Sequence, residues 1–483
     1  MLEEVRNEEL ETSKEWKPLI VAFACNWCSY AGADLAGTSR LSYPAEVKII
    51  KVPCSCRVDP IFVMRAFGKG ADGVIVCGCH PGDCHYSTGN YYTRRRFTLL
   101  FNLLEFMGIE RERMRLEWIS AAEATKFAKI MNEFTDKIKE LGPNSRLVDL
   151  RNVPEGQAES WEVTHTYPTP YKFPTINTDF EPKQAQIEEE MRKRARQLLE
   201  SGEVDRVLAW KAGDFDTMPE PAFFTNLQQL DDLVYNRFCS ANLSKYLMVA
   251  PWLGGKQDKF DKTAIFLRPC DSFSFNQLIK ENRTKREHVH IIGIGCGGVV
   301  AVEEMEEVGL YEKCTVCEKT EHPVYDELIG AELSTERTQI EGRFDMVERI
   351  EKLTPEERFK YWQGQLYKCI RCNACRNTCP VCNCKKCVFS SEKYDITSKA
   401  NATDFEGQMF HIIRAFHVAG RCSDCGECSR VCPQGIPIHL LNRKFIKDIN
   451  EYYGEFQAGL DIEAPEPLTS FNAEGDAVGH NRN

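Results

Sequence analysis

The chain has 483 residues, of which 42% are hydrophobic and 28% charged, and its formal net charge is −11 at pH 7. These values are typical of folded globular domains, about two to four of them at this length, and exclude a disordered chain. The sequence has no apolar run of membrane-spanning length and no basic arm, so we expect neither a membrane span nor a nucleic-acid partner. The acidic N-terminus does not resemble an export signal, and we expect a cytoplasmic protein.

The most informative feature of the composition is its 23 cysteines. Disulfides are typical of small secreted domains. A large chain in a reducing compartment uses clustered Cys-x-x-Cys spacings to bind metals or iron–sulfur clusters instead. Zinc is the competing ligand, and the spacing of the cysteines near the C-terminus decides against zinc for at least eight of them.

Residues 18–142 alternate the patterns of strands and helices. Short apolar runs predict four strands, at 18–25, 47–54, 72–79 and 113–120. Apolar positions at helical spacing predict three helices, at 59–70, 90–108 and 121–142. Repeated strand–helix units predict an α/β domain with a doubly wound, flavodoxin-like parallel sheet. Within the second helix, Arg94, Arg95 and Arg96 are interpreted as a solvated face, with a docking patch for an acidic partner as the alternative.

The rest of the chain divides into four segments by composition. Residues 143–182 are polar and rich in proline, which predicts a linker. Residues 183–350 again show strand–helix patterns and predict a second α/β domain. Residues 355–450 hold the densest cysteines and predict a ferredoxin-like domain. The acidic residues 456–483 are interpreted as a poorly packed C-terminal tail.

Two runs with the spacing Cys-x2-Cys-x2-Cys-x3-Cys-Pro lie in the ferredoxin-like domain. In this spacing three thiolates hold one [4Fe–4S] cluster and the fourth reaches the other cluster. The first ferredoxin set is therefore expected to be Cys369, Cys372, Cys375 and Cys432. The second ferredoxin set is expected to be Cys422, Cys425, Cys428 and Cys379. The segment between the two runs is an insertion that could shape a docking face.

Seven cysteines follow the first three predicted strands: Cys25, Cys28, Cys54, Cys56, Cys77, Cys79 and Cys84. Because the carboxyl ends of parallel strands share one edge of a sheet, these thiols should converge there. A metal cluster at this edge is the favoured interpretation, and a set of inert buried cysteines is the alternative. His80 and His85 flank the last of the cysteines, and we expect them to form hydrogen bonds rather than to replace a thiolate ligand.

Three segments of this domain resemble the delta subunit of methyl-viologen-reducing hydrogenase: ACNWCSYAGADLAGTSRLSYP, GADGVIVCGCHPGDCHYSTGNY and LEWISAAEATKFAK. That family also recurs fused to heterodisulfide reductase flavin subunits. The resemblance implies one [2Fe–2S] cluster that passes electrons to such a flavin subunit. It implies that four of five cysteines hold the cluster: Cys25, Cys28, Cys54, Cys79 and Cys84. Cys56 and Cys77 stand where that family is expected to have glycines, so the ligand set remains open.

In the middle domain, the segments RPCDSF, GIGCGG and CTVCE are similar to beta subunits of deazaflavin-coenzyme-reducing hydrogenases and formate dehydrogenases. This resemblance implies a third [4Fe–4S] cluster and often FAD. By position the cluster would take the middle set, Cys270, Cys296, Cys314 and Cys317. Free or zinc-bound thiols are the alternative. A further set of four is conceivable from the remaining cysteines, Cys239, Cys382, Cys384 and Cys387.

Together these features predict an iron–sulfur electron-transfer subunit of a multisubunit anaerobic oxidoreductase. Its partners would be a dehydrogenase or hydrogenase and a heterodisulfide-reductase-like flavin protein of the kind that can bifurcate electrons. The chain itself would perform no chemistry on a substrate. The alternative is an FAD-containing protein that directly oxidises NADH or a deazaflavin, and a zinc-stabilised scaffold is a third hypothesis.

Overall fold

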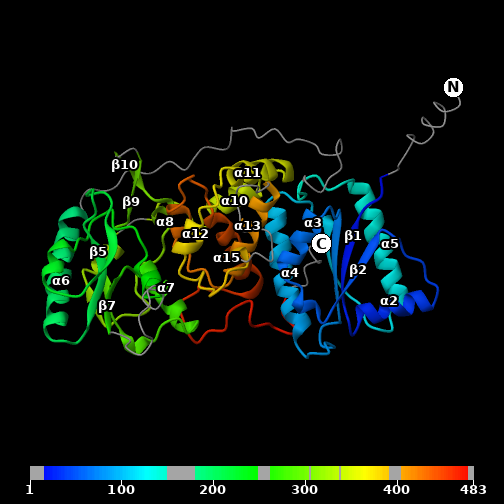
Figure 1. Cartoon of the computed structure of the whole chain (residues 1–483), viewed down its shortest axis with the longest axis horizontal. Coiled ribbons are helices and arrows are strands. Elements are labelled where there is room, and N and C mark those ends of the chain that lie inside the picture. The colour runs from blue at the N-terminus through cyan, green and yellow to red at the C-terminus, as the bar shows by residue number, and fades with distance from the viewer. Residues whose placement is uncertain are drawn as a thin grey trace, which may run out of the picture.

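The computed structural model describes residues 16–149, 180–248, 262–303, 306–336, 339–390 and 404–476. Three folded regions lie in a row along the long axis of the molecule (Figure 1). The N-terminal domain occupies one end and the middle domain the other, and the cysteine-rich C-terminal region lies between them. The order in space therefore differs from the order in the chain. Within the described ranges, no helix combines the length and the hydrophobicity that crossing a bilayer requires.

The N-terminal domain is built on a parallel four-stranded sheet with the strand order β2-β1-β3-β4. Its strands are β1 (Ile20–Cys25), β2 (Val47–Val52), β3 (Gly73–Gly78) and β4 (Met114–Trp118). The register pairs Cys25 with Val52 and Ala24 with Cys77, so the carboxyl ends of the first three strands meet at one edge. The predicted parallel sheet is confirmed, and each strand lies inside the range expected for it.

Helices cover both faces of this sheet. The side chains of Ile20 and Ile75 pack in one core with α2 (Ser29–Thr38) and α5 (Ala124–Leu141). Val21 and Val74 point the other way, as alternation along a strand requires, and pack against α3 (Pro60–Gly68) and α4 (Gly89–Phe106). Helix α3 begins where the Asp59 carboxylate accepts the Ile61 N–H at 2.9 Å. Two short 3₁₀ turns connect the elements, η1 (Ser55–Arg57) and η2 (Arg111–Arg113).

The middle domain contains a five-stranded sheet in the order β11-β8-β7-β5-β6, in which only β6 is antiparallel to its neighbour. Its strands are β5 (Arg206–Lys211), β6 (Glu220–Phe224), β7 (Thr263–Leu267), β8 (Val289–Ile294) and β11 (Glu327–Ile329). A separate hairpin consists of β9 (Val300–Glu303) and β10 (Glu306–Leu310). The helical elements are α6 (Glu181–Glu200), η5 (Gln228–Asp232), η6 (Leu243–Met248), α7 (Pro269–Lys280), η8 (Arg286–His288), α8 (Glu312–Thr315) and α9 (Glu332–Thr335).

The C-terminal region is helical and packs directly on the N-terminal domain. Its helices are α10 (Asp345–Glu351), α11 (Pro355–Tyr367), α12 (Ala374–Thr378), η9 (Val388–Ser390), α13 (Asp404–His417), α14 (Glu427–Arg430) and α15 (His439–Tyr453). The ring centroids of Phe106 in α4 and Trp362 in α11 are 5.6 Å apart, and α13 lies against α3. One continuous hydrophobic core therefore joins the two regions. Residues 150–179 of the predicted linker lie outside the described residues.

The final segment of the chain contradicts two of our expectations. Arg94 and Arg95 are buried rather than solvated, and Arg95 forms an ion pair with Asp476 at 2.6 Å. Phe471 stacks on Tyr91, with ring centroids 4.6 Å apart. The predicted solvated arginine face and the predicted poorly packed tail are therefore wrong for the described residues. The reason is that the tail supplies the negative charge that the arginines of α4 need in order to be buried.

Candidate metal centres

The two ferredoxin runs adopt the same backbone conformation. Arg371 and Asp424, two residues after the first cysteine of each run, have φ angles of 53° and 55°. Two residues further on, Asn373 and Gly426 have φ angles of 62° and 69° and precede the short helices α12 and α14. Left-handed conformations are uncommon outside glycine, so their repetition at equal spacing indicates two loops of one shape.

This loop shape directs backbone N–H groups at sulfur. The Arg371 N–H donates to Cys369 Sγ at 3.4 Å, and the Asp424 N–H donates to Cys422 Sγ at 3.4 Å. Hydrogen bonds to the ligating sulfurs are a property of iron–sulfur sites, where they help to set the reduction potential. The donor set and the loop shape thus fit a [4Fe–4S] cluster in each run.

The structure brings the members of each ferredoxin set together. The cavity that Cys369, Cys372 and Cys375 line also contains Cys432 of the other run. Cys379 is close enough to the second run for its charge to raise the pKa of Cys422, Cys425 and Cys428. The fourth cysteine of each run thus lies beside the first three cysteines of the other run.

Burial shapes the acidity of these thiols. It raises the pKa of Cys422 and of Cys425 to about 12, because a buried environment disfavours the thiolate. A bound iron ion reverses this preference, since thiolates are the form that ligates metal. Burial therefore disfavours the thiolates of Cys422 and Cys425, and metal ligation favours them.

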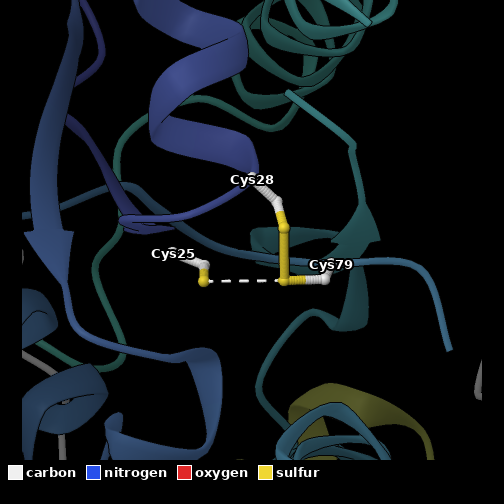
Figure 2. Close-up of side chains that lie close together, drawn as sticks. All are labelled: Cys25, Cys28 and Cys79. Carbon is white, nitrogen blue, oxygen red and sulfur yellow. Dashed lines mark hydrogen bonds between the residues drawn. A yellow bond between two sulfur atoms is a disulfide. The ribbon is translucent and has the colours of Figure 1, made fainter. Parts of the chain in front are cut away.

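In the N-terminal domain, Cys25, Cys28 and Cys79 form the first of two groups of thiols. They come from the end of β1, the start of α2 and the end of β3, and their Sγ atoms all lie within 4.8 Å of one another. Figure 2 shows Cys28 and Cys79 joined as a disulfide, with Cys25 Sγ at 3.7 Å from Cys79 Sγ. A disulfide and metal ligation are alternative states of the same sulfur atoms, so a cluster here requires the reduced form.

A buried serine fixes the first group. The Ser29 hydroxyl accepts the Cys25 N–H at 2.8 Å and donates to the Cys77 carbonyl at 2.8 Å. These two hydrogen bonds link the end of β1 to the end of β3 beneath the thiols. The loops that carry the first group are thereby held to each other.

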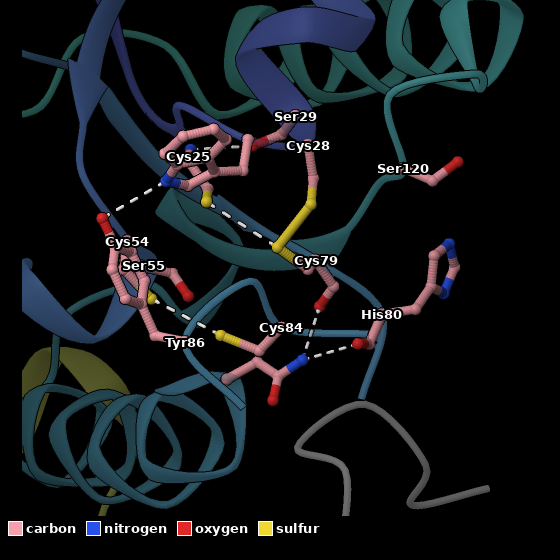
Figure 3. The surroundings of a disulfide bond; sticks show 12 residues. Cys25, Cys28, Ser29, Cys54, Ser55, Cys79, His80, Cys84, Tyr86 and Ser120 are labelled. Atoms are coloured by element: carbon pink, nitrogen blue, oxygen red, sulfur yellow. Dashed lines mark hydrogen bonds between the residues drawn. A yellow bond between two sulfur atoms is a disulfide. The ribbon is translucent and has the colours of Figure 1, made fainter. Parts of the chain in front are cut away.

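Cys54, Cys56 and Cys84 form the second group, which surrounds Gly89 at the start of α4. Cys54 Sγ lies 3.8 Å from Cys84 Sγ, and Figure 3 shows this pair beside the first group. A Cβ atom on Gly89 would lie 2.7, 3.1 and 3.2 Å from the sulfurs of Cys54, Cys56 and Cys84. Because glycine has no Cβ, the three sulfur atoms can approach one another beside Gly89.

Cys56 belongs to this group although the resemblance did not assign it. Hydrogen bonds from Cys25 and Cys56 hold the pKa of the Cys54 thiol below its ordinary range, which connects the two groups electrostatically. The signal in the sequence was the place of Cys56 at the end of the second predicted strand. The structure therefore gathers six thiols where a four-ligand cluster needs four.

Cys77 is the one cysteine of the N-terminal domain that does not join the other thiols at the edge of the sheet. Its side chain is fully buried in the core between the sheet and α5, together with Ile75 and Phe127. Burial raises the pKa of its thiol. Cys77 is therefore a core residue.

The two neighbouring histidines have partners other than the thiols. His80 Nε2 lies 2.7 Å from Glu123 Oε2, and His85 stacks on Trp27 with ring centroids 3.7 Å apart. With six thiols available, neither histidine is needed as a ligand. Trp27 Nε1 also donates to Tyr86 Oη at 3.3 Å, which places exposed aromatic side chains at this edge.

The middle set lines one cavity of about 360 Å³ between the middle domain and the C-terminal region. Cys425 of the second ferredoxin set lines the same cavity. The Gly298 N–H donates to Cys296 Sγ at 3.4 Å and the Val299 N–H donates to Cys314 Sγ at 3.4 Å. Backbone donors to sulfur recur here, so this site also fits an iron–sulfur cluster.

The structure does not gather the further set of four. Cys239 is fully buried in the core of the middle domain, where its Sγ accepts the Asn236 N–H at 3.3 Å. Cys382 instead has Cys379 and Cys387 as electrostatic neighbours, and Cys384 is exposed. Cys239 is therefore not a ligand partner of the cysteines at 382–387.

Two family models match separate parts of the chain. Residues 20–142 match the family described as methyl-viologen-reducing hydrogenase, delta subunit, and residues 365–436 match the 4Fe-4S dicluster domain. The chain is 60% identical over 131 residues to the iron-sulfur subunit of the F420-non-reducing hydrogenase of Archaeoglobus profundus, covering 27% of this chain and 96% of that protein.

Two further similarities involve larger assemblies. The chain is 46% identical over 135 residues to one subunit of the ferredoxin/F420H2-dependent CoB-CoM heterodisulfide reductase of Methanosarcina acetivorans, covering 28% of this chain and 17% of that protein. A solved structure of the F420-reducing [NiFe] hydrogenase complex from Methanosarcina barkeri aligns with 41% of this chain and 92% of its own, at 12% identity. Its TM-score of 0.22 is too low to support an argument.

Proposed function

Because the chain belongs, through residues 20–142, to the methyl-viologen-reducing hydrogenase delta-subunit family, we propose that it transfers electrons within a cytoplasmic oxidoreductase complex. It would connect a dehydrogenase or hydrogenase partner to a flavin protein similar to the matched heterodisulfide reductase subunit. Such a flavin protein could bifurcate electrons. The observation that carries the proposal is the placement of four sets of cysteines in three regions along one molecule.

Each site has residues suited to one type of cluster. The first and second ferredoxin sets would each hold one [4Fe–4S] cluster, as the matched dicluster domain supports. Four of the six convergent N-terminal thiols would hold one [2Fe–2S] cluster, and the middle set would hold a third [4Fe–4S] cluster. When bound, each cluster supplies one-electron transfer.

The arrangement of the thiols supports a continuous path. Cys425 lines the cavity of the middle set, which places the second ferredoxin set beside the middle domain. On the opposite side, α3 and α4 share a hydrophobic core with the ferredoxin-like region. The cysteines of the three regions are therefore held by elements that pack against one another.

Anaerobic counting of iron and acid-labile sulfide, combined with EPR, tests the proposal. Two ferredoxin clusters and one two-iron cluster require about 10 iron atoms per chain, and a third cubane raises the number to about 14. A colourless anaerobic preparation that contains only zinc would overturn it. Flavin released from the denatured chain, together with direct reduction by NADH or a deazaflavin, would support the alternative of an FAD-containing protein.

A further inference from the structure

Helix α13 lies alongside both ferredoxin sets. It belongs to the insertion between the two cysteine runs, and it packs against α11, α15 and α3. His411 of α13 lines the cavity that contains the first ferredoxin set. Arg414 is one turn further along, and residues three apart share a helix face. The face of α13 that bears these two residues is therefore turned toward the thiols.

Arg414 lies between the two sets of ligands. The thiols that act electrostatically on it include Cys428 and Cys379 of the second ferredoxin set and Cys375 of the first. Cys375 and Cys428 also belong to the same hydrophobic core as Ile413, the neighbour of Arg414 in the helix. The guanidinium is thus close to thiols from both runs, and Cys428 of the second set acts on it most strongly.

The guanidinium of Arg414 has no hydrogen-bond acceptor among the residues that the structure describes. Its side chain is 2% exposed, and Nε, Nη1 and Nη2 are all buried without a partner. Other buried arginines are paired: Arg268 Nε donates to Asp271 at 2.8 Å, and Arg443 Nε donates to Asp424 at 3.1 Å. A buried, unpaired cation is strongly unfavourable, so Arg414 requires a negative partner that is not one of the described side chains.

An iron–sulfur cubane with four thiolates is such a partner. It carries net negative charge, and its sulfur atoms accept hydrogen bonds. Reduction adds one electron and therefore one more negative charge to the cluster, with no bond formed or broken. A cation held beside the cluster by the protein stabilises the reduced state more than the oxidised state, because attraction grows with charge.

We propose that Arg414 is the positive partner of both ferredoxin clusters and raises their reduction potentials, with the larger effect on the cluster of the second set. Arg414 acts here as a positioning residue of the electron-transfer path. The proposal depends on the two ferredoxin clusters and not on the partners proposed above. Iron counting therefore distinguishes two negative results: a chain that does not bind the clusters, and a chain that binds them but whose potentials do not depend on Arg414.

The test is an EPR-monitored redox titration of the full-length, cluster-loaded chain with dithionite as the reductant. Arg414→Gln is expected to keep its iron and sulfide content and to shift both cubane potentials to more negative values. The second cluster should shift more. Arg196→Gln is the matched control, because Arg196 is an exposed arginine of α6 and its loss removes the same charge. The control should leave both potentials unchanged.

A conservative variant keeps the proposal falsifiable. Arg414→Lys retains the charge with fewer donors, so its potentials should lie between those of the wild type and of Arg414→Gln. Unchanged potentials in a cluster-loaded Arg414→Gln variant would overturn the proposal. If Arg414→Gln loses its iron, Arg414→Lys decides: retention of both clusters supports a role for the charge, and equal loss of iron overturns it.

Discussion

The ferredoxin-like region and the N-terminal domain gather their thiols by different means. In the former, three cysteines of each set lie within seven residues, and a repeated loop with φ angles of 53° and 55° at Arg371 and Asp424 orients them. In the latter, thiols from three separate loops meet because parallel strands end at one edge. Local spacing therefore specifies the ligands in one region, whereas topology gathers more thiols than are needed in the other.

The strongest test of this difference is the removal of one ferredoxin ligand. Cys372→Ser is expected to eliminate one [4Fe–4S] EPR signal and about four iron atoms per chain, because a cubane with four cysteine ligands loses one of them. The signal of the two-iron cluster should persist. Cys384→Ser, a change of an exposed cysteine outside both runs, serves as the control. Loss of the two-iron signal in Cys372→Ser would show that the two regions do not bind their clusters independently.

The N-terminal site should be sensitive to a residue that is not a ligand. Gly89→Ala places a methyl group against the sulfurs of Cys54, Cys56 and Cys84, so we expect loss of the two-iron EPR signal with both ferredoxin signals retained. Gly37→Ala is the matched control, since a Cβ at Gly37 in α2 meets no atom within 4 Å. A wild-type two-iron signal in Gly89→Ala would mean that the cluster does not use the space beside Gly89.

The buried ion pair of the tail should matter for stability and not for cluster binding. Asp476→Asn leaves Arg95 without its charged partner, so we expect a loss of about 3 kcal/mol in the free energy of unfolding. The measurement is thermal unfolding under anaerobic conditions, with EPR as a check that both regions keep their signals. Asp461→Asn, at an exposed position of the same tail, is the control.

The same ion pair gives a pH dependence. Burial raises the pKa of Asp476, but hydrogen bonds from Arg95 and the Asn472 N–H outweigh burial and hold the pKa below its ordinary value. A carboxyl group whose pKa is lowered by folding stabilises the fold at pH values above its ordinary pKa of about 4. This stabilisation is lost as the pH falls through the lowered pKa. The stability difference between wild type and Asp476→Asn should therefore be full at pH 7 and shrink in acid. A difference that grows in acid would contradict this assignment.

The smallest effect is expected at Cys77. Cys77→Ser buries a hydroxyl in an apolar core, which should cost about 1–3 kcal/mol in stability and leave every EPR signal unchanged. Cys25→Ser, in the convergent group, should alter the two-iron signal instead. A changed two-iron signal in Cys77→Ser would place Cys77 among the ligands.

The strands of the N-terminal domain were accessible from sequence, because they follow from local apolar patterns. The sequence also placed Cys432 beside the first run and Cys379 beside the second, where the structure has them, whereas their role as ligands stays a prediction. The alternation rule could also have identified Cys77: it lies two residues after Ile75 on β3 and shares its face. The convergence of Cys56 with Cys54 follows from their shared place at the end of the second strand.

Other features could not be predicted from sequence. The pairing of Arg95 with Asp476 joins residues 381 positions apart, and no local pattern encodes such a contact. The same holds for Arg414, whose neighbours come from both cysteine runs. Arg94 and Arg95, which the sequence suggested were solvated, are buried here because a distant segment supplies the opposite charge.

The shared hydrophobic core has a consequence for biosynthesis. Helices α3 and α4 are complete by residue 106, yet the helices that cover their outer face begin at residue 345. A ribosome adds residues one at a time, so this apolar face must remain in contact with water, or with a chaperone, while about half of the polypeptide is still being made. A chain that terminates early would keep the face uncovered and would be prone to aggregate.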